Sequence, residues 1–253
     1  MELSIDRYLE RIGMEKSPFL TYDYLRRLQL NHQLSVPYET LDIMYQAPNF
    51  TLKLEDVYDK VVNRGRGGYC FELNLLFGWL LRSLGFTVVD HFARFLRNSE
   101  SIPMRRHRVL RVTCEGRDYI ADVGVGSKCP KYPMLLSEGL EQIFDDEVYC
   151  YERDRLLGWV CMEKKGDSWR PMYSFTDEAN FDIDFEAIHF YCRFNPEIEF
   201  RTKAVASIRT EEGRCTLAGN EFKNFTTNGV EIYTATTEAE FKKALKTYFN
   251  IVI

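Results

Sequence analysis

The sequence predicts an α+β fold in which an N-terminal helical bundle precedes a central β-barrel-like domain and a C-terminal α/β lid. Apolar residues recur at helical spacing up to residue 84, and from residue 86 the apolar period falls to two. Short strands then lead to a helix start at Thr237, with Glu240 at capping-box spacing. We therefore divide the chain into a helical domain (1–85), a barrel-like domain (86–181) and a lid domain (182–253).

The helical domain carries four stripes of apolar residues. They lie at positions 5–12, 24–28, 54–61 and 70–84. Gly13 and Gly85 follow the first and the last stripe, and glycine is a typical residue just after a helix end. The last stripe is the widest, so it predicts a helix that is buried in the core.

The barrel-like domain and the lid are marked by alternating stretches that predict strands. These are residues 86–96, 106–114, 117–123, 156–163, 168–175, 204–210, 214–218 and 230–236. Residues 182–194 have helical spacing and predict a helix that connects the two groups of strands. No linker rich in proline or serine separates the parts, so we expect them to pack closely.

Composition excludes several classes of function. The net charge of −5 gives no basis for nucleic-acid binding. Seven cysteines form an odd set without tight Cys-x-x-Cys spacing, and the N-terminus is too charged for a signal peptide, so we expect reduced thiols in the cytoplasm. The densest apolar run, 73–84, is too short to cross a membrane. No spacing typical of metal ligands occurs.

Cys70 is the candidate nucleophile. It follows the glycine-rich turn RGRGGY (64–69) and opens the predicted helix 70–84. A thiol at a helix N-terminus lies beside unpaired N–H groups and the positive end of the helix dipole, which favours the thiolate and lowers its pKa. Arg64 and Arg66 add positive charge nearby. We therefore predict that Cys70 is activated by its position.

His107 is the candidate base among four histidines. The other three have simpler interpretations: a surface or cap role for His32, an ordinary strand position for His91 and packing for His189. His107 begins a predicted hairpin whose turn is Glu115–Gly116.

The register of that hairpin decides whether His107 meets Asp122. A two-residue turn pairs Cys114 with Arg117 and places Asp122 diagonally beside His107 on one face. A three-residue turn would place Asp122 on the opposite face. The two-residue turn therefore predicts an imidazole held by a carboxylate.

These motifs resemble those of the arylamine N-acetyltransferases, over nearly the whole chain. The matching segments are RGGYCFELN (66–74), PMRRHRVL (103–110), DVGVG (122–126), VPYETLD (36–42), DFE (184–186) and NPEIEF (195–200). The form of the segment before His107 is similar to bacterial members. The resemblance implies a Cys70–His107–Asp122 triad, an acetyl thioester intermediate, acetyl-coenzyme A as co-substrate without a tightly bound cofactor, and an aromatic amine or hydrazine as acceptor.

The resemblance also implies a fold and binding residues. A nucleophile on a helix start that faces His and Asp on strands resembles the papain and transglutaminase core. Tyr38, Val125 and Phe200 are implied in the acceptor pocket, and Gly124 and Gly126 in close approach of the coenzyme. Val125 stands where members often carry phenylalanine, which removes one aromatic wall.

Three other functions remain open at this stage. An amide synthase that takes its acyl group from a carrier protein would use the same triad, as would a transglutaminase-like thiol hydrolase. A catalytically silent binding module is the third alternative, although such a module has no need of all three triad residues. Turnover of a coenzyme A thioester without a carrier protein separates the first reading from these alternatives.

Overall fold

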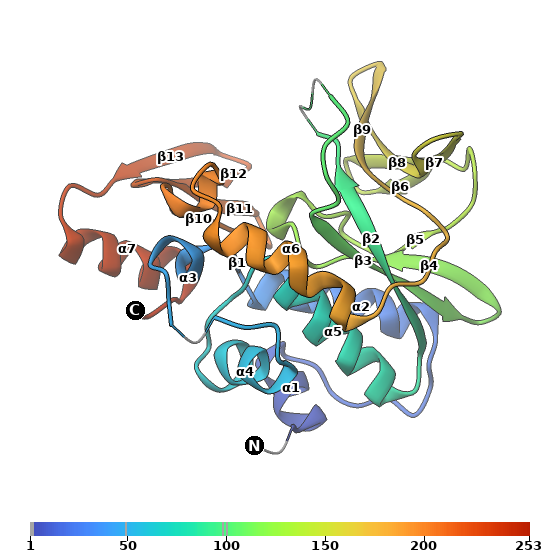
Figure 1. The fold of residues 1–253 in the computed structure, drawn as a ribbon, viewed down its shortest axis with the longest axis horizontal. Helices are drawn as coiled ribbons and strands as arrows, with labels where there is room; N and C mark the ends of the chain where they lie inside the picture. Colours follow the sequence, from blue (N-terminus) through green and yellow to red (C-terminus); the bar gives the residue numbers. More distant parts are fainter. Residues whose placement is uncertain (1–2, 49, 98, 100) are drawn as a thin grey trace.

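The computed structural model describes residues 3–48, 50–97, 99 and 101–253. Helices of the N-terminal part form the lower layer, the barrel-like sheet lies above one end and a smaller sheet above the other (Figure 1). The helices are α1 (Ile5–Arg11), α2 (Tyr22–Ser35), α3 (Leu41–Met44), α4 (Leu54–Tyr58), α5 (Cys70–Leu84), α6 (Asp182–Phe194) and α7 (Glu238–Phe249). Helix α4 continues into a π-helical turn, Asp59–Asn63.

Helix α5 is the central helix of the first core. Eleven of its residues are buried, and Gly85 ends it with a φ of 107°, a left-handed conformation that glycine adopts without strain. At the other end, the N–H of Tyr69 donates to the carboxylate of Glu72 at 3.0 Å. The sequence prediction for this helix, 70–84, is confirmed at both ends. Cys70 therefore lies at the first position of a helix fixed by packing along its length.

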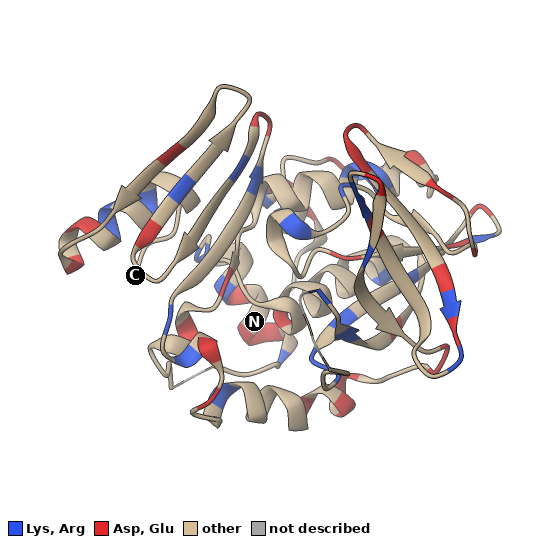
Figure 2. Ribbon diagram, turned by 90° about the horizontal axis from the view of Figure 1, so that it is seen from above, with Lys and Arg blue, Asp and Glu red and all other residues tan. Residues whose placement is uncertain are grey.

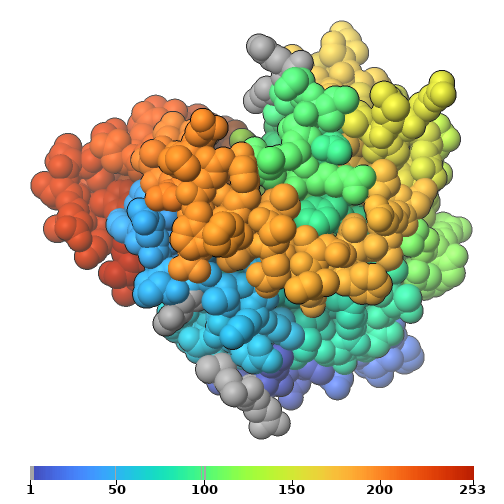
Figure 3. Space-filling view, in the orientation of Figure 1, coloured from blue at the N-terminus to red at the C-terminus, as the bar shows by residue number. Residues whose placement is uncertain are grey.

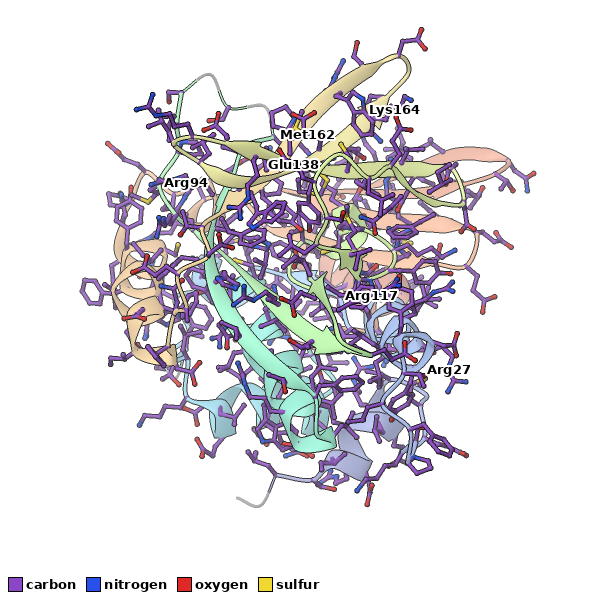
Figure 4. The ribbon with its side chains drawn as sticks, turned by 90° about the vertical axis from the view of Figure 1, so that its right-hand side faces the viewer. Arg27, Arg94, Arg117, Glu138, Met162 and Lys164 are labelled. Atoms are coloured by element: carbon purple, nitrogen blue, oxygen red, sulfur yellow. The ribbon has the colours of Figure 1, made fainter. Side chains whose placement is uncertain are left out.

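The larger sheet has eight antiparallel strands in the order β5-β4-β3-β2-β9-β8-β7-β6. Their bounds are β2 (Thr87–Phe95), β3 (His107–Cys114), β4 (Arg117–Ala121), β5 (Met134–Leu135), β6 (Gln142–Phe144), β7 (Glu147–Asp154), β8 (Gly158–Lys165) and β9 (Ser168–Phe175). Figure 4 faces this sheet, with Arg117 beside the β3–β4 turn and Lys164 near the β8–β9 turn.

The two edges of that sheet meet through one side chain. The amide of Gln142 on β6 accepts from the N–H of Leu135 on β5 at 2.8 Å and donates to its carbonyl at 2.9 Å. These two hydrogen bonds join the edge strands β5 and β6, which in a closed barrel would be joined by backbone hydrogen bonds. The predicted barrel-like sheet is confirmed, and it is nearly closed.

The smaller sheet has the order β1-β10-β11-β12-β13. Its strands are β1 (Tyr38–Glu39), β10 (Val205–Thr210), β11 (Gly213–Ala218), β12 (Glu221–Thr226) and β13 (Gly229–Thr234), and α7 packs on it. Strand β1 comes from the N-terminal part, and Phe185 and Cys192 of α6 lie in the first core. The packing thus crosses the sequence boundaries drawn at residues 86 and 182.

Local patterns found some strands and missed others. The predicted segments 168–175 and 182–194 coincide with β9 and α6, and Thr237 and Glu240 cap α7 as expected. The strands β1, β5, β6, β7 and β12 were not predicted. Strand β7 ends in Glu152–Asp154 and β12 carries Lys223 and Asn224, so both lack a clean apolar alternation. These segments form strands because neighbouring strands supply their backbone hydrogen-bond partners, which their own residue pattern does not reveal.

Candidate active site

A pocket of about 140 Å³ lies where the start of α5, the barrel-like sheet and α6 meet. Cys70 and His107 both line it, as do three of the implied binding residues and Gly124. The other lining residues were not singled out from the sequence. The full lining is Tyr38, Tyr69, Cys70, Phe95, Pro103, Met104, Arg106, His107, Gly124, Val125, Cys192 and Phe200. Residues far apart in the chain thus share one cavity.

His107 and Asp122 are in direct contact. The distance from Nε2 of His107 to Oδ2 of Asp122 is 2.7 Å, and both side chains are buried. The β3–β4 ladder pairs Cys114 with Arg117, so the two-residue turn and its consequence are confirmed. Because the carboxylate occupies Nε2, the proton lies on that nitrogen and Nδ1 keeps a free lone pair. The ring is therefore poised to accept a proton through Nδ1.

Asn74 holds Asp122 in place, and the sequence analysis missed it. Its Nδ2 donates to Oδ1 of Asp122 at 2.8 Å, and its Oδ1 accepts the N–H of Val123 at 3.0 Å. The N–H of Gly124 donates to Oδ1 of Asp122 at 2.8 Å. Asn74 is four residues after Cys70, on the same face of a helix. A polar residue at that spacing from a candidate nucleophile was the available signal.

Burial sets the protonation of Cys70. Desolvation raises the pKa of its thiol well above the usual value, and the charges of Cys192 and Asp122 act in the same direction. The N–H of Phe71 and the charge of Arg106 oppose this rise. The expectation of a lowered pKa is therefore corrected: the start of α5 is buried, so solvation is lost. A thiolate at this site needs an imidazolium beside it.

The two arginines before Cys70 do not supply that charge. Arg66 donates to Glu39 at 2.7 Å and to Asp42 at 3.0 Å, and Arg64 pairs with Asp59. Both were expected to add positive charge near the thiol. Their charges are neutralised by carboxylates instead.

Of the three remaining histidines, only His32 differs from its sequence interpretation. His32 is fully buried and contacts the hydroxyl of Tyr8 through Nδ1 at 2.8 Å, so a surface role is wrong. Burial lowers the pKa of His32 to about 3. His91 lies in strand β2, as expected. His189 packs against Phe50 and also contacts the hydroxyl of Tyr69, the residue before Cys70, at 2.6 Å.

Close packing of the chain explains why glycine stands at positions 124 and 126. A Cβ on Gly124 would lie 2.5 Å from Nδ2 of Asn74 and 3.0 Å from Cβ of Cys70. Gly126 has a φ of 57°, and its Cβ would lie 2.9 Å from atoms of Ser207 and Tyr38. The loop after β4 can therefore approach α5 and β10 only with glycine at these positions. Close approach of a coenzyme to them stays a prediction.

A larger groove of about 580 Å³ continues from the pocket between the barrel-like sheet and the smaller sheet (Figure 3). It shares four aromatic or aliphatic side chains with the pocket, namely Tyr38, Phe95, Val125 and Phe200. Its charged lining consists of three cations and two carboxylates: Lys128, Arg214, Lys223, Glu199 and Glu221. Lys223 pairs with Glu221 at 2.8 Å. Elsewhere the charges of both signs are mixed over the elements (Figure 2). The groove is thus a channel of mixed charge that joins the pocket lined by Cys70.

Other kinds of site are not found. Within the described residues, no group of three or more side chains could hold a metal ion. In the same part of the chain, no helix is long and apolar enough to cross a membrane. All seven cysteines are free thiols.

Comparison with known proteins places the chain in a family. A family model described as N-acetyltransferase matches residues 21–253. The arylamine N-acetyltransferase of Mycobacterium bovis is 33% identical over 236 residues, which cover 91% of this chain and 83% of that protein. The solved arylamine N-acetyltransferase from M. tuberculosis superposes with a TM-score of 0.90 at 31% identity, covering 98% of this chain and 94% of that one.

A second solved structure bears on the groove. The Mycobacterium marinum arylamine N-acetyltransferase in complex with CoA superposes with a TM-score of 0.89 at 30% identity, covering 98% of this chain and 93% of that one. Together with the pocket that brings Cys70 to His107 and Asp122, these matches show that the chain belongs to the arylamine N-acetyltransferase family.

Proposed function

We propose that this chain transfers an acetyl group from acetyl-coenzyme A to an arylamine or arylhydrazine in two steps, through a thioester on Cys70. The observation that carries the proposal is the pocket in which Cys70 lies with His107, whose imidazole is 2.7 Å from Asp122. A helix-start cysteine that faces His and Asp also supports the expected cysteine-protease and transglutaminase type of core, which we include in the proposal.

The first step acetylates Cys70. Nδ1 of His107 takes the thiol proton, and the sulfur attacks the thioester carbonyl. A bond forms between Sγ and the acetyl carbon, the bond from that carbon to the coenzyme sulfur breaks, and His107 returns the proton to the leaving thiolate. Because the pocket is apolar and buried, the proton acceptor has to be inside it, and acid–base help of this kind contributes about 10²–10⁴-fold.

The second step transfers the acetyl group. The amine nitrogen attacks the thioester of Cys70, the carbon–sulfur bond breaks, and His107 carries the amine proton to the sulfur. Asp122 stabilises the imidazolium in both steps and keeps Nδ1 toward the thiol. The N–H of Cys70, at the start of α5, is our candidate donor to the oxyanion. The same base thus serves both half-reactions.

We assign the coenzyme to the groove between the barrel-like sheet and the smaller sheet, where Lys128 and Arg214 lie. Burial and the charges of Arg97 and Arg214 lower the pKa of Lys128, so cations lie close together there, although Arg97 pairs with Glu163 and Lys223 with Glu221. Such a cluster suits the phosphates of a coenzyme, while the shared residues Tyr38 and Val125 lead the thioester to the thiol. Tyr38, Val125 and Phe200 are the proposed contacts for the acceptor ring.

Intact mass spectrometry after incubation with acetyl-coenzyme A alone tests this function. We expect a gain of one acetyl group that maps to Cys70, and its loss as amide when an arylamine is added. The Cys70→Ser variant should gain none, whereas Cys215→Ser, changed in the smaller sheet, should be acetylated normally. Acetylation only in the presence of a carrier protein, or on another cysteine, would contradict the proposal.

A further inference from the structure

Helix α6 has apolar residues on the side that faces solvent as well as on the side that faces the protein. The inner side, which includes Phe185 and Cys192, packs into the first core. The outer side carries four exposed apolar residues, which we term the outer stripe. They are Ile183, Ala187, Phe190 and Phe194. In Figure 3 the residues of α6, in orange, lie on the face that is turned to the viewer. Apolar residues on two sides are typical of a helix with two packing partners, and this fold supplies one.

The outer stripe exposes a large apolar surface. Ile183 is 76% exposed, Phe190 64% and Phe194 48%. Because a fully exposed aromatic side chain presents about 200 Å², the outer stripe presents on the order of 400 Å². Phe181, which precedes the helix, is 70% exposed as well. Apolar patches of about 300–600 Å² are the largest that a typical soluble monomer carries, and they often mark binding surfaces.

The spacing of the outer stripe is that of a seam between two helices. Its residues follow one another after four, three and four positions along the chain. This is the alternation of a coiled coil, in which each apolar residue packs into a hole between residues of a second helix. Such a stripe is narrower than the apolar face by which a helix packs on a core. The spacing therefore indicates a second helix as the occupant.

The outer stripe is complementary to itself when two copies of α6 run antiparallel. Ile183 of one copy then lies opposite Phe194 of the other, and Ala187 lies opposite Phe190. Each layer of the seam thus combines one large ring with one smaller side chain. A parallel pair would place Phe190 against Phe190 and Ala187 against Ala187, so one layer would be overfilled and another left with a void.

The charges beside the outer stripe favour the same arrangement. Glu186 and Arg193 lie on one edge of the stripe, because seven residues make about two helical turns. Neither side chain forms an ion pair with any residue that the structure describes, and the carbonyls of Ala47 and Phe50 hold the guanidinium of Arg193 in place. In an antiparallel pair, Glu186 of each copy lies beside Arg193 of the other, and symmetry makes two such contacts.

The N-terminal half of α6 disfavours a lipid surface as the occupant. It carries three carboxylates, those of Asp182, Asp184 and Glu186. Helices that lie on anionic membranes carry Lys and Arg on their polar face instead. Acidic residues near one end of α6 and Arg193 near the other suit a second copy that runs in the opposite direction.

We propose that the outer stripe of α6 is the interface of a twofold-symmetric homodimer, in which the α6 helices of two copies pack antiparallel. This inference goes beyond the proposed function and does not depend on it. The two stripes together bury on the order of 800 Å², and their flanks, with Phe181 and Glu186, bring the total past the roughly 1,000 Å² that a specific interface needs. Because this area is near the lower limit, we expect the dimer to dissociate on dilution.

Sedimentation velocity over a range of protein concentrations tests the dimer. We expect the sedimentation coefficient to rise from the monomer value to the dimer value as the concentration increases. Phe190→Asp should raise the dissociation constant by at least about tenfold, because it removes a central ring and brings a carboxylate into the seam of each copy. Phe190 is exposed in the single chain, so the variant should keep its thermal unfolding temperature.

Phe19→Asp is the matched control, because Phe19 is 71% exposed and lies far from α6. Its neighbour Leu20 accepts the thiol of Cys114, at the opposite end of β3 from Arg108, which pairs with α6. The control should dimerise normally. A chain that stays monomeric at all concentrations would overturn the proposal, and so would a dimer that Phe190→Asp does not weaken more than Phe19→Asp does.

Disulfide cross-linking tests the antiparallel direction separately. Positions 183 and 194 lie eleven residues apart on one helix, about 16 Å, which is too far for a disulfide within a chain. In the proposed dimer they face each other across the seam. The double variant Ile183→Cys/Phe194→Cys should therefore form a covalent dimer under mild oxidation, whereas Ile183→Cys alone should not. The seven native cysteines are buried and give little background. A covalent dimer from the single variant would mean a parallel pair and would contradict the arrangement.

The effect of Glu186→Lys distinguishes a second copy from lipid. In the dimer this change replaces an attraction to Arg193 with a repulsion, so it should weaken dimerisation several-fold, and more at low salt than at high salt. Co-sedimentation with vesicles of phosphatidylcholine and phosphatidylglycerol should show no binding of the unchanged protein. Binding that Phe190→Asp abolishes and Glu186→Lys strengthens, in a chain that sediments as a monomer, would assign the outer stripe to lipid and overturn the proposal.

Discussion

Two buried polar clusters flank the start of α5, and they differ in how completely they are paired. On one side Cys70 faces the His107–Asp122 pair across a cavity. On the other side lies a cluster of five charged residues, which we term the charge cluster. Its members are Glu39, Asp42, Lys60, Arg66 and Glu72.

The charge cluster uses nearly all of its hydrogen-bonding capacity internally. Nζ of Lys60 is 2.7 Å from Asp42 and 2.9 Å from Glu72, and Glu39 accepts both from Arg66 and from the N–H of Leu41. The thiol of Cys70, in contrast, contacts one backbone carbonyl and otherwise faces the pocket. The charged groups of the cluster are paired with one another even where Asp42, Lys60 and Glu72 border a small polar cavity, whereas the thiol has no ionic partner on the side that faces its pocket.

Replacing Asp122 should have the largest effect. In Asp122→Asn, the N–H donors of Asn74 and Gly124 hold the amide oxygen, so the amide nitrogen faces Nε2 of His107. The ring proton then moves to Nδ1, which can no longer take the proton of Cys70. We expect kcat/KM to fall about 10⁴-fold, as for other triads with this change.

The rate of acetyl-enzyme formation by stopped flow checks the effect of Asp122→Asn, with thermal unfolding as the control for folding. If a stable Asp122→Asn variant acetylates Cys70 at a near-normal rate, acetylation does not depend on the carboxylate of Asp122.

Lys60→Met should lower the free energy of unfolding by disrupting the charge cluster. It leaves the buried carboxylate of Glu72 and the half-buried carboxylate of Asp42 with one cation fewer, and removal of one partner from a buried ion pair costs about 3–5 kcal/mol. Urea unfolding gives the free energy. Lys242→Met is the matched control, because Lys242 pairs with Glu238 on an exposed face of α7, and we expect it to change little. Equal effects in the two variants would mean that the charge cluster is not structural.

The pH dependence of the free energy of unfolding should reveal that the charge cluster has one carboxylate more than it has cations. Three carboxylates share two cations there, and burial raises the pKa of Glu72 from 4.5 to about 7 even though Lys60 opposes the rise. The folded state therefore keeps a proton that the unfolded chain loses. Stability from this group is complete below its unfolded pKa of 4.5 and is lost as the pH rises through about 7.

The comparison of the protein with Glu72→Gln isolates that contribution of Glu72. His32 and His189, whose pKa values burial lowers to about 3 and about 4, act in the opposite direction below the usual histidine pKa, and they cancel in the comparison. Between about pH 5 and pH 8 we expect the unchanged protein to lose on the order of 1–3 kcal/mol relative to the variant. Parallel urea-unfolding profiles would show that Glu72 keeps an ordinary pKa.

Val125→Phe should have the smallest effect, and it changes the wall of the pocket that Cys70 faces. Val125 lines both the pocket and the groove, so a ring there should narrow the acceptor wall. We expect discrimination between a small and a bulky arylamine to shift toward the small one by about tenfold, within the roughly 1–3 kcal/mol that one pocket contact supplies. The measurement is the ratio of kcat/KM in the two proteins. No shift would leave acceptor choice to Tyr38 and Phe200.

The sequence by itself determined the features that depend on neighbours within a few residues. The helix 70–84 follows from its apolar period and Gly85, the cap of α7 from Thr237 and Glu240, and the hairpin register from a two-residue turn. That register sufficed to bring Asp122 to His107, because side chains alternate along a strand with a period of two.

Only the tertiary structure decided which groups are solvated and which are paired. Cys70 lost its predicted activation because distant segments bury the start of α5, and Arg66 is held by Glu39 and Asp42. His32 is buried against Tyr8, and β1 joins a sheet built from residues beyond 204. Solvation and charge pairing depend on atoms that meet only after the chain has closed long loops. No local pattern of residues carries that information.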